Sequence, residues 1–292
     1  MSKNNDLLYA IEDQLEVLKL KHMSEALDEM FRSKDFIDMD KMTVIARMVE
    51  AEYEDKTNKL LERHLRDAHL KGAPQEIELC VDSKDREYLP LDITKALSTL
   101  DFINEGLNVC ILGPSDSGKS YLAKALGIEA CAKYKVGYVH CEPFLEEMVS
   151  IKESDFEKYQ KKMRKHVNKE LFILDDFLLH TLTDEREIKV LYELLETRSE
   201  LSRSTIVCSQ REPSSWTAMM LNDKVSANAI SKRAARHYTV VINPKNTLNL
   251  LLLLAAVQQR RAAAGKRITD RWSAQNALRV LYSLNENSSI RI

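Results

Sequence analysis

Long apolar runs are scarce in this sequence of 292 residues. The longest, residues 250–257, has eight residues, far short of the roughly 20 that a helix needs to cross a bilayer. The N-terminus is polar and has no apolar signal core. We therefore expect a soluble, cytoplasmic protein with no membrane partner.

Closely spaced cysteines are also missing. The five cysteines are scattered, and no C-x-x-C pair occurs among Cys80, Cys110, Cys131, Cys141 and Cys208. The absence of closely spaced cysteine pairs from the sequence argues against a zinc site or a disulfide framework. The cysteines are predicted to be buried thiols.

A large net charge is absent, since the formal charge is −2 with 30% charged residues. The balance is uneven, because residues 245–279 hold seven Lys and Arg against one acid, Asp270. Such a basic segment is either a solvated helical face or a contact for nucleic-acid phosphates. Both interpretations stay open from the sequence.

The most informative stretch is Gly-Pro-Ser-Asp-Ser-Gly-Lys-Ser at residues 113–120. It follows an apolar run and precedes a helix-favouring one, and it fits the G-x-x-x-x-G-K-[ST] phosphate loop. Loop amides and a helix N-terminus point at phosphates in such loops, while Lys119 would reach the outer phosphates of ATP and Ser120 would bind Mg²⁺. The predicted nucleotide-binding residues are Gly113, Pro114, Ser115, Asp116, Ser117, Gly118, Lys119, Ser120 and Tyr121.

Asp116 occupies a position where such loops usually carry glycine. Aspartate tolerates left-handed backbone geometry, but it brings a negative charge close to the phosphates. Weaker nucleotide binding is a consequence to test.

Two acids follow the apolar run of residues 171–174. Ligands bind at the carboxyl ends of strands in open α/β sheets. Asp175 would orient Mg²⁺ through water, and Asp176 would position or activate the attacking water. A helix cap is the alternative, but the phosphate loop about 55 residues upstream favours catalysis.

Two further polar residues are candidates for the site. Gln210 follows the predicted strand 205–208 and would sense the terminal phosphate, or make a loop hydrogen bond. Arg233, on a predicted helix, would enter the nucleotide site of a neighbouring subunit and stabilise transition-state charge, which predicts a homo-oligomer. Arg233 could instead cap its helix or pair with an acid of its own chain, and Arg236 could exchange roles with it.

Four segments are expected along the chain. Helical apolar spacing predicts an N-terminal helical domain that binds DNA or a partner over residues 1–72, and Gly72, Pro74 and Pro90 suggest a linker over 73–92. Strands alternating with helices predict a parallel αβα ATPase core over 93–245. Residues 246–292 are expected to form a basic, helical C-terminal segment.

Two basic stripes lie on predicted helices. One comprises Lys56, Lys59, Arg63 and Arg66, and it is either a DNA or partner surface or a solvated face paired with Glu54 and Glu62. The other lies within the charged stretch 151–169 between strands and comprises Lys158, Lys161, Lys162, Arg164 and Lys165. Helices of that kind are usually solvated, but this one could line a pore or groove.

These residues together resemble the AAA+ ATPases of the DnaC/IstB group, specifically the IstB-type helpers of insertion-sequence transposition. The resemblance covers residues 12–243. Its more specific matches are Leu-Leu-Glu-Arg at 60–63, Asn-Val-Cys-Ile-Leu-Gly-Pro at 108–114, Leu-Asp-Asp-Phe at 174–177, Arg-Ser-Thr-Ile-Val at 203–207 before Ser209 and Gln210, and Trp216 with Asp223.

The resemblance implies a P-loop AAA+ fold with an N-terminal helical domain. It also implies nucleotide ligands at Lys119 and Ser120, Mg²⁺ and catalytic acids at Asp175 and Asp176, a sensor at Gln210 and an arginine finger at Arg233. The implied function is an ATP-hydrolysing regulator that assembles on duplex DNA and activates or targets a transposase.

Three departures from the family pattern bear on activity. Asp116 replaces the loop glycine, Leu178 follows Phe177 where glycine is frequent, and residues 243–247 lack the sensor arginine, with only Lys245 nearby. One alternative is a DnaC-like loader that grips a replicative helicase through its N-terminal domain. Another is a non-hydrolysing, nucleotide-gated DNA scaffold.

Overall fold

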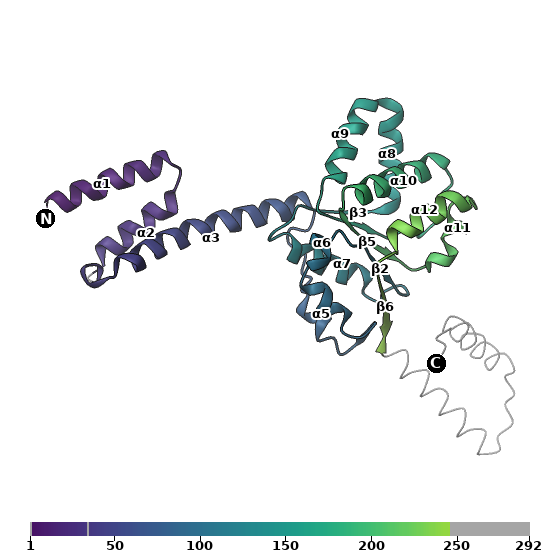
Figure 1. Cartoon of the computed structure of the whole chain (residues 1–292), viewed down its shortest axis with the longest axis horizontal. Helices are drawn as coiled ribbons and strands as arrows, with labels where there is room; N and C mark the ends of the chain where they lie inside the picture. Colours follow the sequence, from purple (N-terminus) through teal and green to yellow (C-terminus); the bar gives the residue numbers. More distant parts are fainter. Residues whose placement is uncertain (1, 34, 246–292) are drawn as a thin grey trace, which may run out of the picture. The chain divides into compact units, whose positions relative to one another are not determined.

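A computed structural model describes residues 2–33 and 35–245 (Figure 1). The chain divides into two units, Met1–Asn243 and Pro244–Ile292. The predicted C-terminal segment 246–292 lies outside the described residues. Within the described part, no helix is long and apolar enough to cross a membrane.

The N-terminal region is helical, as predicted. It contains α1 (Ser2–Val17), α2 (Lys21–Arg32), the 3-10 turn η1 (Phe36–Asp38) and α3 (Lys41–Asp67). No side chain caps α2 locally; instead, Glu52 of α3 accepts hydrogen bonds from the backbone N–H groups of His22 (3.0 Å) and Met23 (3.3 Å). This carboxylate satisfies helix-end donors and so ties α2 to α3.

Part of α3 carries an apolar stripe that α1 and α2 leave uncovered. Met42, Ile45, Val49 and Tyr53 follow helical spacing, yet they are 69%, 52%, 51% and 67% exposed. The periodicity correctly predicted the helix, but it did not predict burial.

The core is a six-stranded sheet with the order β1-β6-β2-β5-β4-β3. Strands β2 and β6, β2 and β5, β5 and β4, and β4 and β3 all pair in parallel, which confirms the predicted parallel core. The strands are β1 (Arg86–Leu89), β2 (Val109–Leu112), β3 (Val136–His140), β4 (Leu171–Asp175), β5 (Ser204–Ser209) and β6 (Tyr238–Pro244).

The predicted linker 73–92 contains part of this core. It holds the short helix α4 (Glu78–Val81) as well as β1, which lies beside β6 at the edge of the sheet. Residues 1–243 cluster as one unit, so the division at residue 72 stays a prediction.

Helices cover both faces of the sheet (Figure 1). Alternate strand residues supply two separate cores: Cys110 and Leu112 belong to one, and Val109 and Ile111 to the other. The first core packs against α8 (Cys141–Ser154), α9 (Phe156–Val167), α10 (Glu185–Glu200), α11 (Trp216–Met219) and α12 (Lys224–Ala234), with the turn η2 (Pro213–Ser215) before α11. The second packs against α4, α5 (Ile93–Ser98), α6 (Asp101–Asn104) and α7 (Lys119–Ala130).

Burial on both faces explains why the strands read as continuous apolar runs. All five cysteines are likewise buried, and none forms a disulfide. The prediction of buried thiols is confirmed.

A buried arginine fixes how the site-bearing strand β4 begins. Arg198 of α10 is 0% exposed, and its guanidinium donates to the carbonyls of His166 (2.9 Å), Val167 (3.1 Å) and Lys169 (2.9 Å). It also donates to Thr205 Oγ1 (3.0 Å) of β5. One cation thus satisfies the carbonyls at the end of α9 and ties them to β5.

We expect Arg198→Leu to destabilise the core by about 3 kcal/mol, because several buried carbonyls would lose their donors. The unfolding midpoint in urea measures this loss. Arg164→Leu, at an exposed position of α9, serves as the matched control and should leave the midpoint nearly unchanged. Equal midpoints for the two variants would show that Arg198 is not a structural tie.

Candidate nucleotide-binding site

The phosphate loop begins where β2 ends and closes at the first residue of α7. A Cβ atom at Gly113 would lie 2.8 Å from the carbonyl oxygen of Ile242 in β6, so only glycine fits there. Gly118, the N-cap of α7, has a φ of 99°, a conformation that favours glycine. Glycine is therefore required at both ends of the loop that leads into the N-terminus of α7.

Asp116 has a φ of 60°, the left-handed geometry expected at that position. Its side chain is exposed. The backbone thus adopts the conformation that glycine would provide, and what differs is the added negative charge.

Lys119 is buried at 6% exposure, and its Nζ donates to the carbonyl oxygen of Pro114 at 2.7 Å. Burial lowers the pKa of Lys119, while nearby acidic groups oppose part of the shift. This bond holds the ammonium group across the loop, where it can reach phosphate oxygens.

Ser120 and Asp175 meet, as the sequence predicts for a shared Mg²⁺ site. Ser120 Oγ donates to Asp175 Oδ1 at 3.0 Å. Both are hard oxygen ligands, and Mg²⁺ in phosphate-transfer sites needs few protein ligands beside water and phosphate. The pair fits Mg²⁺.

Tyr138 of β3 completes the surroundings of Asp175 and was missed in the sequence. Its hydroxyl donates to Asp175 Oδ2 at 2.5 Å. Burial, and then the bond to Asp175, raise the pKa of Tyr138, so the hydroxyl remains a donor. In the sequence, only the alternation of side-chain direction along β3 could have indicated Tyr138. That alternation becomes informative only once β3 is known to lie beside β4.

Asp176 lies next to His140, another residue that sequence reasoning missed. His140 Nδ1 is 2.9 Å from Asp176 Oδ2, and Asp176 has a φ of 54°. The left-handed backbone turns the chain directly after β4. His140 is therefore a candidate positioning residue for the acid predicted to activate water.

β5 ends at Ser209, and Gln210 follows it, at the same carboxyl ends of the parallel strands as the acids after β4. Ser209 Oγ donates to the carbonyl of Phe177 (2.8 Å) and accepts from the N–H of Arg211 (3.1 Å). Gln210 follows and is exposed. Its sensor role stays a prediction.

Arg233 contacts residues of its own chain. It forms an ion pair with Glu196, donates to the carbonyl of Ala229 (2.9 Å), and lies with its Cζ 5.4 Å from the ring centroid of Tyr192. This is the intrachain pairing considered above as an alternative. A role between subunits stays a prediction and requires the Glu196 pair to open.

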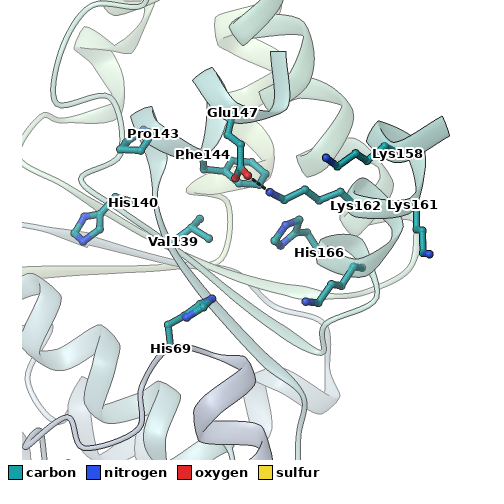
Figure 2. A pocket seen from close by; sticks show the side chains of 11 residues that line it. His69, Val139, His140, Pro143, Phe144, Glu147, Lys158, Lys161, Lys162 and His166 are labelled. Carbon is teal, nitrogen blue, oxygen red and sulfur yellow. Dashed lines mark ion pairs between the residues drawn. The ribbon is translucent and has the colours of Figure 1, made fainter. Parts of the chain in front are cut away.

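A basic groove of about 750 Å³ lies beside the site, at the end of β3 (Figure 2). Val139, Pro143 and Phe144 form its apolar part, and Lys162 pairs with Glu147. His140 lines it too, so the groove and Asp176 share one side chain. The remaining lining residues are cationic or imidazole groups: His69, Lys158, Lys161, Lys165 and His166.

The phosphate loop after central β2, the acids after β4 and the parallel order β6-β2-β5-β4-β3 define an ATP-binding protein of the P-loop AAA+ class. The family model of IstB-like ATP binding proteins matches residues 13–250, and the chain belongs to that family.

Curated relatives agree with this assignment. The chain is 27% identical to the ATP-binding protein of insertion sequence IS232 from Bacillus thuringiensis subsp. berliner, over 78% of this chain and 88% of the relative. It is 30% identical to that of IS1162 from Pseudomonas fluorescens, over 70% and 87%. For IS21 from Pseudomonas aeruginosa, identity is 23% over 80% and 86%.

Solved structures include a DnaC helicase loader, 19% identical with a TM-score of 0.43, covering 56% of this chain and 96% of that one. Another is the replication initiator DnaA bound to AMPPCP and single-stranded DNA, 20% identical with a TM-score of 0.47, covering 59% and 50%.

We expect Asp116→Asn and Asp116→Gly to bind ATP about fivefold more tightly, because removing one charge near the phosphates is worth about 1 kcal/mol. Titration with a fluorescent ATP analogue measures the change. Asparagine also tolerates left-handed backbone, so it isolates the charge. Asp101→Asn, an exposed acid outside the loop, is the control; unchanged affinity in both Asp116 variants would show that the charge is immaterial.

Proposed function

We propose that the chain is an ATP-hydrolysing regulator that assembles on duplex DNA and activates or targets the transposase of its insertion sequence. One observation carries the proposal: a lysine-lined groove lies beside the two acids of the ATP site and shares His140 with them. The family membership supports it. Co-purification tests the partner, and capture of a replicative helicase but not of the transposase would favour a loader instead.

In this proposal, hydrolysis is carried out by residues of the phosphate loop and at the carboxyl ends of β4 and β5. Lys119 and the loop amides would hold the phosphates, and Ser120 with Asp175 would hold Mg²⁺, which neutralises charge on the transferred phosphoryl group. Asp176 would accept a proton from the attacking water. His140 would keep its carboxylate oriented, and Gln210 would contact the terminal phosphate.

Ion pairing distinguishes the two basic stripes found in the sequence. On α3, Lys56 pairs with Glu52 (3.3 Å) and Lys59 with Asp55 (2.7 Å), not with the expected Glu54 and Glu62. Arg63 and Arg66 form no ion pair with a carboxylate of the described residues. On α9, Lys158, Lys161 and Lys165 are exposed and share one helix face, and none pairs with a carboxylate of the described residues. Unneutralised cations at this spacing favour α9 as the surface for DNA phosphates.

We expect the triple substitution of Lys158, Lys161 and Lys165 by alanine to weaken duplex binding and to reduce the slope of log K against log salt by about 3, because each phosphate contact contributes about 0.9. Fluorescence anisotropy over a salt series measures both. The comparison variant replaces Lys56, Lys59 and Arg63 of α3. A larger loss in the α3 variant would move the DNA surface to the N-terminal helices.

We expect Arg233→Ala and Lys119→Ala proteins to be inactive alone and to recover phosphate release when mixed on DNA, because a mixed assembly contains some complete sites. An arginine finger is worth roughly 10³ to 10⁵ in turnover. Glu196→Gln removes the ion pair with Arg233 but leaves the arginine in place, so this variant should remain active. Absence of recovery in mixtures shown to co-assemble would contradict the intersubunit role.

The same assay separates hydrolysis from a scaffold role, which the charge of Asp116 favours. Wild-type protein that assembles on DNA but releases no more phosphate than Lys119→Ala would be a nucleotide-gated scaffold.

A further inference from the structure

Arg86, at the start of β1, lies against the phosphate loop. A Cβ atom built on Gly118 would be 2.8 Å from Arg86 Nε and 3.0 Å from its Cζ. The same Cζ is 6.0 Å from the ring centroid of Tyr121, one turn into α7. The side chain of an edge strand thus fills the space beside the loop at the N-terminus of α7.

The charge of Arg86 is not matched by an acid. Arg86 is half-buried, yet no ion pair joins it to a carboxylate of the described residues. By contrast, Arg186 pairs with two carboxylates, and Arg203 and Arg233 pair with one each. A partly desolvated guanidinium without a carboxylate is a binding group for another anion. The anion for which the adjacent loop is built is phosphate.

The position of Arg86 indicates which phosphates it would meet. Ser120 would bind Mg²⁺, and its Oγ donates to Asp175 Oδ1 at 3.0 Å. Arg86 instead lies over Gly118 and Tyr121. Loop amides at this point hold the α- and β-phosphates in phosphate loops of this pattern.

We propose that Arg86 binds the diphosphate that ATP and ADP share, and so supplies from β1 a cation within the same subunit. The inference rests on nucleotide binding at this loop. Asp116 adds a negative charge to the loop, and residues 243–247 hold no arginine. Arg86 would then supply the site with a second positive group beside Lys119.

The test is titration of the full chain with fluorescent ATP and ADP, for wild type, Arg86→Ala, Arg86→Gln and Arg86→Lys. Loss of a charge-assisted contact should weaken ATP and ADP by the same factor, on the order of tenfold. Lysine should recover part of the affinity, since it keeps the charge but not the planar fork. Lys84→Ala, an exposed cation two residues away, is the control and should bind as wild type does.

Unfolding midpoints without nucleotide identify a folding defect. If Arg86→Ala is destabilised, the nucleotide affinity of Arg86→Gln tests the inference instead, because the aliphatic part of the glutamine side chain still fills part of the space beside Gly118. Wild-type affinity in the folded variants, or a loss confined to ATP, would overturn the inference. A wild-type chain that binds neither nucleotide would overturn nucleotide binding itself and this inference with it.

Discussion

The hydrogen bond from Ser120 to Asp175 joins the phosphate loop to the acids after β4, and the neighbouring polar groups are arranged around it. Asp175 is 1% exposed, and its oxygens accept from Ser120, from Tyr138 and from the N–H of Asp176. Three hydrogen-bond donors thus satisfy this buried carboxylate. Three separate segments, α7, β3 and β4, must therefore keep their register for this one group.

Much of this arrangement could be predicted from local sequence. The phosphate loop, the acids after β4 and the alternation of strands with helices each leave a contiguous signal. The parallel core is confirmed, and Ser120 and Asp175, both predicted to hold Mg²⁺, lie within hydrogen-bond distance of each other. The positive φ of Asp116 also follows from its place in the pattern. Here local constraint and tertiary structure agree.

What could not be predicted depends on which strands become neighbours. Tyr138 and His140 face the acids because β3 pairs with β4, and Arg86 reaches the loop because β1 joins the sheet beside β6. None of these three residues belongs to a motif with fixed spacing. The exposure of the apolar stripe on α3 has the same cause, because helical periodicity indicates an apolar face without showing what covers it.

The groove beside the site illustrates how pairing decides between surfaces of similar composition. Both α3 and α9 carry repeated cations. On α3, acids one turn away pair with Lys56 and Lys59 but not with Arg63 or Arg66, while on α9 only Lys162 among the groove lysines pairs with an acid of the described residues, Glu147. Since exposed ion pairs reduce the field that a phosphate backbone meets, composition alone could not rank the two stripes.

The five buried cysteines have a consequence for how the molecule reacts with electrophiles. Burial raises the pKa of Cys110, Cys131 and Cys141 to about 12, and the nucleophile is the thiolate. In the closed molecule these sulfurs are therefore both inaccessible and protonated at neutral pH. Cys110 and Cys141 belong to the core on one face of the sheet, and Cys80, Cys131 and Cys208 belong to the core on the other. The order in which the thiols become alkylated therefore records which face of the sheet opens first.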